Sequence, residues 1–296
     1  MNIYDCFMYF DEDLLLDLRL NTLNKYISKF VITEATYTHS GSKKKLNFDI
    51  NKFKKFKDKI EYIVVNEQPP NILETNVNDT LEKKGEKLIL NGYARDNYQR
   101  NRLAEGISEA SDNDIVIVSD LDEIPNLKNL NFDKINNKII QFRQKMFYYK
   151  LNLYYPDFEW FGSKACRKKN LLSPQWLRNI KSKKYSKFRI DLIFNKKKYN
   201  NIFYVLDGGW HFTCIRTPEE LEYKLLNFAH HYEFETSGLK KDDIKKLILE
   251  KRVMYDHNVD QKDYKWSGKT KLKKILNSEL PGYLDSNADK YKEWLD

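Results

Sequence analysis

The segment from Asp114 to Pro125 limits what this chain can fold into more than any other part of the sequence. It reads Asp-Ile-Val-Ile-Val-Ser-Asp-Leu-Asp-Glu-Ile-Pro. Four consecutive β-branched residues, Ile115 to Val118, predict a strand buried on both faces, as in the middle of a parallel sheet. Pro125 cannot continue a central strand, so the acidic residues before it should lie in a loop at the carboxyl edge of the sheet. Open α/β sheets bind their ligands at that edge.

Three acidic residues, Asp120, Asp122 and Glu123, follow this predicted strand. Carboxylates two residues apart on an extended backbone point to the same side, so Asp120 and Asp122 are candidates for holding one divalent cation. A cation held by one or two carboxylates usually completes its shell with water and substrate phosphates. The alternative is an acidic turn in which aspartate serves only as a turn former.

The first sixty-five residues are typical of a nucleotide-binding α/β layer. Strands are expected at residues 3–10, 30–33 and 60–65, and an apolar stripe from Leu14 to Tyr26 predicts a helix between the first two. Glu12 and Glu34 come at the ends of the first two strands and are candidate donor-binding residues. No glycine-rich phosphate fingerprint follows any of these strands, which disfavours a dinucleotide fold and a P-loop.

The helix expected from Tyr93 to Ala110 leads directly into the acidic strand. Arg100 on this helix is therefore a candidate for reaching a diphosphate at the sheet's edge, with a surface salt bridge as the alternative. Aromatic residues between Phe142 and Trp160 suit stacking on the apolar face of a sugar, although core packing explains them equally well. The other expected elements are a loop-rich excursion at 71–90, strands at 139–150 and 188–194, a short helix at 173–180, and a helical, lysine-rich end from 239 without recognisable chemistry.

A second dense motif follows a strand predicted at residues 202–206 and reads Asp207-Gly208-Gly209-Trp210-His211-Phe212. Its two glycines permit a tight backbone bend beside the aromatic ring and the imidazole. His211 is a candidate for completing a cation's shell opposite Asp122 or for binding a phosphate, and a structural histidine is the alternative. The sequence Thr217-Pro218-Glu219-Glu220 has the form of a helix start.

Composition limits the classes of binding partner and the cellular compartment that can be expected for this protein. The net charge of +9 is carried mostly by lysine. No nucleic-acid-binding module accompanies the lysines, so no nucleic-acid partner is expected; the alternatives are a lysine-rich face exposed to solvent and peripheral contact with a membrane surface. Cys6, Cys166 and Cys214 are too scattered for a disulfide framework or a structural zinc site. Without a secretory signal or a long apolar span, a cytoplasmic protein is expected.

Four short motifs in order resemble glycosyltransferase family 17, the family of the bisecting β-1,4-mannosyl-glycoprotein β-1,4-N-acetylglucosaminyltransferase. The resemblance covers roughly residues 1–230. Its motifs are Tyr4-Asp5-Cys6-Phe7 with Asp11-Glu12 and the leucine-rich residues 14–20, then Asp120-Leu121-Asp122-Glu123-Ile124-Pro125, then Gly209-Trp210-His211, and finally Thr217-Pro218-Glu219.

The resemblance implies a GT-A-like α/β fold, with a Rossmann-like mixed sheet flanked by helices and a helical C-terminal region. It implies one domain, residues 1–296, made of a nucleotide-sugar half (1–125), an acceptor half (126–235) and an extension (236–296). It also implies an inverting transfer from UDP-N-acetylglucosamine to a glycan hydroxyl that depends on Mn²⁺ or Mg²⁺. On this basis the donor is expected to meet Glu12, Glu34, Arg100, Asp120 and Trp210, and the metal Asp120, Asp122 and His211.

An inverting transfer needs a carboxylate base on the face of the sugar opposite the leaving group, away from the metal pair. The candidates are Asp207, Glu219 and Glu123, with Glu159 behind them. A rival reading is a haloacid-dehalogenase-type phosphatase with Asp120 as nucleophile, although three strands precede a motif that would normally open such a domain. The other rival is a non-catalytic glycan- or polyanion-binding module that uses the aromatic residues and lysines.

Overall fold

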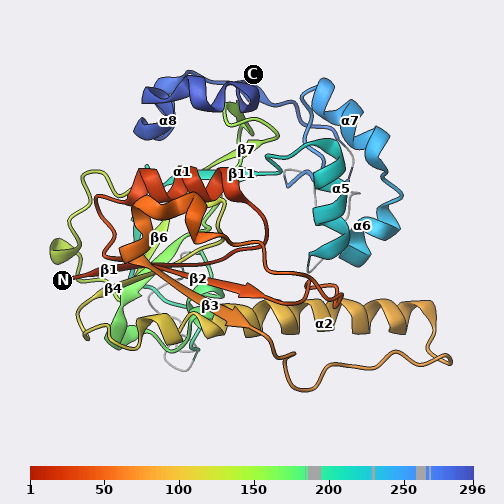
Figure 1. The fold of residues 1–296 in the computed structure, drawn as a ribbon, viewed down its shortest axis with the longest axis horizontal. Helices are drawn as coiled ribbons and strands as arrows, with labels where there is room; N and C mark the ends of the chain where they lie inside the picture. The colour runs from red at the N-terminus through yellow and green to blue at the C-terminus, as the bar shows by residue number, and fades with distance from the viewer. Residues whose placement is uncertain (184, 186–194, 229–230, 258–264, 267) are drawn as a thin grey trace.

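A computed structural model of the protein describes residues 1–183, 185, 195–228, 231–257, 265–266 and 268–296. Within these residues the chain forms two mixed β-sheets flanked by helices (Figure 1). The predicted α/β class, with a mixed sheet between helices and a helical C-terminal region, is confirmed. The strand predicted at residues 188–194 lies outside the described residues.

The larger sheet contains seven strands in the order β10-β6-β9-β4-β1-β2-β3. Its parallel half is made by strands close to those predicted, and β9 runs antiparallel to both of its neighbours. The acidic segment therefore follows a strand in the middle of the sheet, as its sequence predicted. The bounds are β1 (Ile3–Met8), β2 (Lys29–Ala35), β3 (Ile60–Val65), β4 (Ile115–Val118), β6 (Ile139–Phe142), β9 (Lys164–Arg167) and β10 (Ile202–Val205).

Strand β4 is buried on both faces. Ile115 and Ile117 pack in the apolar cluster that includes helix α1 (Asp13–Leu23), whereas Val116 and Val118 pack in a second cluster on the opposite face. Figure 1 shows α1 on one side of the sheet and α2 (Leu81–Arg102) on the other. Each fully buried Val or Ile side chain contributes about 1.5–3 kcal/mol to stability, so these four residues fix the position of the acidic segment firmly.

The smaller sheet has the strand order β12-β8-β7-β11-β5. Residues 123–125, which were expected in a loop, form the short edge strand β5, and an edge is where a proline can be accommodated. Gly209 has φ +118°, and a Cβ atom there would lie 2.2 Å from the carbonyl oxygen of Ile124, so only glycine lets β11 approach β5. The bounds are β5 (Glu123–Pro125), β7 (Lys145–Tyr148), β8 (Leu153–Tyr154), β11 (Gly209–Thr213) and β12 (Lys273–Lys274).

Two expected elements differ from the structure. The loop predicted at residues 71–90 is wrong over its second half, because α2 begins at Leu81, where the Thr80 hydroxyl accepts a hydrogen bond from Lys83 N (3.3 Å). The single strand predicted at residues 139–150 is two strands, β6 and β7, which belong to different sheets. The helix start at Thr217 is confirmed: Thr217 and Glu220 form a capping box with Pro218 at the first helical position.

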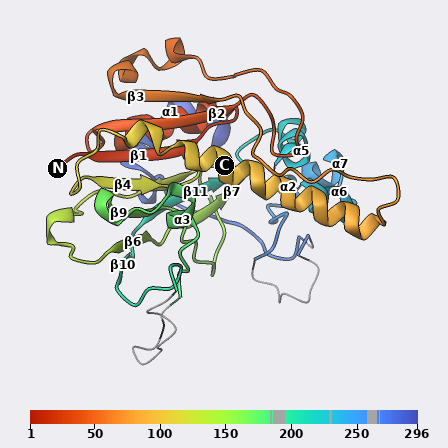
Figure 2. The same ribbon diagram turned by 90° about the horizontal axis from the view of Figure 1, so that it is seen from below.

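The remaining helices cover the sheets and the C-terminal part of the chain. Figure 2 shows α2 and α3 across the face of the larger sheet that lies opposite α1, and α8 packs beside α1. None of the helices in the described ranges has the length and apolarity needed to cross a membrane. The bounds are α3 (Pro174–Arg178), α5 (Pro218–Asn227), α6 (His231–Ser237), α7 (Lys241–Leu249) and α8 (Gly282–Ser286), with 3-10 helices η1 (Ile50–Lys59), η2 (Glu105–Ile107), η3 (Phe132–Lys134), η4 (Lys168–Asn170), η5 (Asn277–Glu279) and η6 (Ala288–Trp294).

Candidate active site

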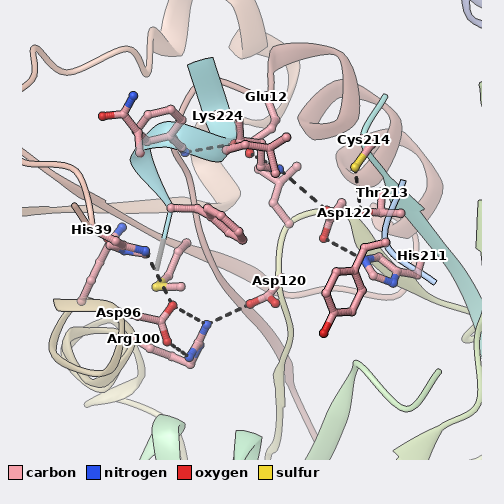
Figure 3. A pocket seen from close by; sticks show the side chains of 18 of the residues that line it. Glu12, His39, Asp96, Arg100, Asp120, Asp122, His211, Thr213, Cys214 and Lys224 are labelled. Atoms are coloured by element: carbon pink, nitrogen blue, oxygen red, sulfur yellow. Dashed lines mark hydrogen bonds and ion pairs between the residues drawn. The ribbon is translucent and has the colours of Figure 1, made fainter. Parts of the chain in front are cut away.

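A cavity of about 780 Å³ opens beyond the carboxyl ends of β1 and β4. Its lining includes residues from the ends of these two strands, from α2, β7, β11 and α5, and, later in the chain, Met254, Tyr255, His257 and Trp266. The acidic segment that dominates the sequence contributes Asp120, Leu121 and Asp122 to this lining. The expectation that these acids reach a ligand-sized space at the sheet's carboxyl edge is therefore met by their placement (Figure 3).

Residues 120–123, which we call the acidic turn, are held in place by Arg19, a fully buried residue of α1. Its guanidinium donates two hydrogen bonds to Asp5 (2.8 and 2.6 Å) on β1. The same group donates to the backbone carbonyls of residues 120, 121 and 123 (3.1, 3.1 and 2.7 Å). Five charge-assisted or backbone contacts from one side chain fix the path of the turn before any ligand binds.

Asp120 is clamped between two arginines. One of its carboxylate oxygens accepts a hydrogen bond from Arg100 Nη2 (3.0 Å) and the other from Arg178 Nη2 (2.6 Å). Burial by itself would raise the pKa of Asp120, but the two guanidiniums, with Arg178 the stronger, hold this pKa well below its usual range. Asp120 is therefore ionised at neutral pH and has a fixed orientation.

Arg178 also ties Glu123 into the same network. Its Nη2 donates to Glu123 Oε1 (2.7 Å), and Trp160 Nε1 donates to the same oxygen (2.7 Å). The other oxygen of Glu123 accepts from the backbone N–H of Asp120 (2.9 Å). Glu123 is fully buried with both oxygens engaged, so its place is that of a group that shapes the turn.

Asp122 belongs to a second group of charged side chains, on the other side of the cavity from Asp120, in which acidic and basic residues alternate (Figure 3). Its carboxylate lies 3.6 Å from His211 Nε2 and 4.0 Å from Lys224 Nζ, both longer than a hydrogen bond. Lys224 lies 3.2 Å from Glu12, which is also 3.2 Å from Arg216. Burial favours the neutral form of Glu12, but Lys224 and Arg216 outweigh it and lower its pKa to about 2.

His211 is buried between a carboxylate and an aromatic ring. Its imidazole stacks on Trp160 with ring centroids 5.0 Å apart and an interplanar angle of 28°. Burial opposes the charge on His211, yet the neighbouring Asp122 raises its pKa above the ordinary value. Its Nδ1 atom is buried without a hydrogen-bond partner among the described residues. A buried polar atom in this condition is costly unless a ligand or water engages it.

The three residues predicted to bind metal are not gathered into one cluster. Figure 3 shows Asp120 directed towards Arg100 and Asp122 directed towards His211, so the two carboxylates do not point the same way as expected. Across the described residues, no three His, Cys, Asp or Glu side chains are arranged to hold a metal ion. The donor set fits instead a hard cation that takes one or two carboxylate oxygens and completes its shell with water and phosphate.

The predicted catalytic bases are not brought to the cavity. Asp207 is exposed and accepts a hydrogen bond from Asn126 (3.1 Å), and Glu219 is exposed near Lys241 (3.7 Å). Glu159, the further candidate, pairs with Arg143 on the surface (2.7 Å). Local sequence placed Asp207 and Glu219 beside recognisable motifs, but Asp207 lies in the bend before β11 and Glu219 on the exposed first turn of α5. The carboxylates that do line it are Glu12, Asp96, Asp120, Asp122 and Glu233.

The predicted donor-binding residues divide in the same way. Glu12, Arg100 and Asp120 line the cavity. Glu34 does not, because it is fully buried beneath the loop at residues 44–48, where it pairs with Lys44 and accepts hydrogen bonds from Asn47 N, Phe48 N and the Tyr62 hydroxyl. Trp210 lies on the opposite face of β11 from His211, and its indole donates to the carbonyl of Glu279 (2.8 Å).

Sequence reasoning missed Arg19, Arg178 and Lys224. Arg19 gave one signal, a charged residue inside an otherwise leucine-rich helical stripe. Arg178 and Lys224 gave none, because each lies in a short helix whose direction depends on long-range packing. Tyr255, His257 and Trp266 also line the cavity, although no chemistry was expected in that part of the chain.

Comparison with models of protein families matches the chain over residues 1–296 to the model described as glycosyltransferase family 17. The comparisons with curated proteins and with solved structures gave no match. The family match covers the whole chain, including the C-terminal part that the sequence motifs did not reach.

Proposed function

The chain belongs to glycosyltransferase family 17 and is a glycosyltransferase, and from this premise we propose that it transfers N-acetylglucosamine from UDP-N-acetylglucosamine to a glycan hydroxyl. The proposal includes a GT-A-like fold, dependence on Mn²⁺ or Mg²⁺ and inversion at the anomeric carbon. Membership of this family favours transfer over the phosphatase and the non-catalytic binding module that the sequence also suggested.

The balance of charge in the cavity is the observation that carries the metal dependence. Four lysine and arginine side chains line the cavity, and each already faces a carboxylate: Lys44 faces Glu34, Arg100 faces Asp96 and Asp120, Arg178 faces Asp120 and Glu123, and Lys224 faces Glu12 and Asp122. A diphosphate would therefore enter a site whose cations are already neutralised. Burying such an anion without added positive charge is strongly unfavourable, which supports a divalent cation as part of the donor complex.

Asp122 is the carboxylate best placed to hold that cation, with His211 and Asp120 as its predicted companions. Its charged neighbours lie at 3.6 and 4.0 Å, whereas both oxygens of Asp120 already accept short hydrogen bonds from arginine. When bound, the cation would neutralise the charge that develops on the diphosphate leaving group. Arg100 and Arg178 keep Asp120 ionised and oriented, and Lys224 Nζ lies 4.0 Å from Asp122 beside the same space.

The inverting step needs a base on the acceptor side. The acceptor oxygen forms its bond to the anomeric carbon as the bond from that carbon to the diphosphate oxygen breaks, and the hydroxyl proton passes to a carboxylate. Glu233 lines the cavity from α6, a different element from the acidic turn that follows β4, and we assign it the role of base.

Calorimetric titration with UDP, with and without Mn²⁺, tests the proposal. UDP should bind about tenfold or more tightly with Mn²⁺. Asp122→Asn should abolish the difference, and Asp112→Asn, the same change at an exposed residue outside the lining, should keep it. UDP binding that is indifferent to both Mn²⁺ and Asp122→Asn would show the proposed donor site to be wrong.

Donor identity and stereochemistry need a second measurement. Slow hydrolysis should be faster for UDP-N-acetylglucosamine than for UDP-glucose or UDP-galactose. The first N-acetylglucosamine released from the α-linked donor should be the β anomer, which ¹H NMR detects before mutarotation. Release of the α anomer would contradict inversion.

A further inference from the structure

One wall of the cavity is built from aromatic side chains, and three of them come from the C-terminal part of the chain. Tyr255, His257 and Trp266 line the cavity together with Trp160 and Tyr148. We refer to these five residues as the aromatic wall. Tyr148 belongs to β7 in the smaller sheet, so the wall lies on a different element from the acidic turn that follows β4.

The wall is held in place by the buried carboxylate of Asp256. Asp256 is fully buried and accepts hydrogen bonds from the Tyr155 hydroxyl (2.7 Å) and from Thr270 N and Oγ1 (3.0 and 2.7 Å). The Tyr148 hydroxyl donates to the carbonyl of Tyr255 (3.2 Å). These bonds fix the carbonyl of Tyr255 and the residue that follows it, so the Tyr255 ring is positioned before a ligand arrives.

The rings of the wall pack against one another. Tyr255 meets Trp266 edge to face, with centroids 5.1 Å apart, and meets His257 at 4.9 Å. Burial lowers the pKa of His257 to about 4, so its imidazole is neutral near pH 7. Trp160, at the other end, stacks on His211, whose opposite contact is Asp122. The aromatic surface therefore continues directly into the proposed donor side.

Building on the proposed function, we propose that the aromatic wall is the acceptor subsite, and that it takes a pyranose whose apolar face stacks on Tyr255 and Trp266. Rigid aromatic rings supply large contact area at a low cost in conformational entropy. Lys265 Nζ lies 5.6 Å from the centroid of the Tyr255 ring, so a cation accompanies the aromatic area on this side.

Saturation-transfer NMR on the whole chain, loaded with UDP and Mn²⁺, tests the subsite with methyl β-D-mannopyranoside and methyl β-D-glucopyranoside as probes. We expect saturation on the axial ring protons of at least one of these glycosides. Tyr255→Leu and Trp266→Leu should each weaken glycoside binding about tenfold, while Tyr255→Phe and Trp266→Phe should retain most of it.

Donor binding separates this proposal from the proposed function. The leucine variants should bind UDP and Mn²⁺ as the wild type does, and circular dichroism reports whether they are folded; the phenylalanine variants and Tyr255→Leu serve where Trp266→Leu is destabilised. Glycoside binding that survives both leucine changes, or absence of saturation on every neutral glycoside in the wild type, overturns the acceptor subsite. Loss of metal-dependent UDP binding in the wild type would instead overturn the donor site.

Discussion

At the scale of single residues, Asp120 and Asp122 are two positions apart but have different surroundings. Asp120 accepts short hydrogen bonds from two guanidiniums, whereas the charged neighbours of Asp122 stand off at 3.6 and 4.0 Å. A carboxylate bound by two arginines cannot give up its lone pairs cheaply, so it serves best as a fixed point of the turn. Asp122 has the space that an incoming ligand needs.

The proposed base gives a prediction that distinguishes the residue chosen from the structure from the residues suggested by the sequence alone. Glu233→Gln should lower kcat for UDP release from UDP-N-acetylglucosamine by about 10²–10⁴-fold and leave UDP affinity unchanged, because a base acts on the proton and not on the donor. Asp207→Asn and Glu219→Gln should change kcat little, since both residues are exposed outside the cavity lining. A large loss in Asp207→Asn with none in Glu233→Gln would return the role to the residue that sequence alone suggested.

Lys164 predicts a pH dependence of stability. It is buried, and its ammonium donates to the carbonyls of Arg178 (2.6 Å) and Ile180 (2.5 Å), at the end of α3. Burial, and then the charge of Arg178, lower its pKa to about 7. Between that pKa and the unfolded value of about 10.4, the unfolded chain binds more protons, so the free energy of unfolding should rise with pH.

Urea titrations between pH 7 and 10 measure this slope. Lys164 should contribute at most about 1.4 kcal/mol per pH unit, and Lys164→Met should flatten the curve by that contribution. Lys169→Met, at an exposed lysine in η4, should keep the wild-type slope. A slope that is the same in wild type and Lys164→Met would show that Lys164 is not neutral in the folded protein.

Residues were predictable where their chemistry depends on neighbours in sequence. Asp120, Asp122 and His211 were found because a buried strand, or a glycine pair beside an aromatic residue, marks them locally. Arg178 and Lys224 act across 58 and 102 positions of sequence from the acids they face, and no local pattern carries that information. The same holds for the aromatic wall, whose members come from residues 148 to 266.

At the scale of elements, the central strands were predicted closely and the peripheral ones were not. A strand buried on both faces must be apolar throughout, so β4 is visible as Ile-Val-Ile-Val. Helix α2 has an exposed, polar first half, which resembles a loop in sequence. The division of residues 139–150 between two sheets depends on which strands are available to pair with β6 and β7, and an alternating apolar pattern does not specify its partner.

Gly106 in η2 and Gly282 in α8 provide a matched pair of glycine substitutions. A Cβ atom on Gly106 would lie 2.4 Å from Cγ1 of Val31, a fully buried residue of β2. Gly106→Ala should therefore lower the free energy of unfolding by about 1–3 kcal/mol through overpacking. Gly282→Ala is the control: at the start of α8 nothing lies within 4 Å of the added atom, and reduced freedom of the unfolded chain should raise stability by up to about 1 kcal/mol.

Denaturant unfolding measures both variants. Equal stability changes in the two proteins would mean that η2 is not packed tightly against β2. Gly106→Ser would then be tolerated as well, although its side chain is larger.

At the scale of the whole molecule, the cavity draws on almost the full length of the chain. Residues from Met8 to Trp266 line it, and they come from both sheets and from helices α2 and α5. A ligand that binds only the folded protein raises its free energy of unfolding by about 2.7 kcal/mol at a hundredfold excess over Kd, and every element that contributes to the cavity shares in this stabilisation.

Hydrogen exchange followed by mass spectrometry tests this coupling. UDP with Mn²⁺ should slow exchange in peptides that contain residues 8–12 and 119–123 and also in α5, because Lys224 joins that helix to Glu12 and Asp122. UDP with an excess of chelator should protect these peptides less. Protection confined to the first 125 residues would mean that α5 takes no part in holding the donor.

The buried Asp5–Arg19 pair has a consequence for how activity emerges during folding. Asp5 lies on the first strand, Arg19 on the first helix, and the carbonyls that Arg19 fixes lie more than a hundred residues later. Until β1 and β4 are side by side, the acidic turn has no defined path and the two aspartates have no fixed relation to one another. The proposed metal site is thus assembled only when β1 and β4 have paired, and a chain that has folded incompletely would not be able to use up the proposed donor by hydrolysing it.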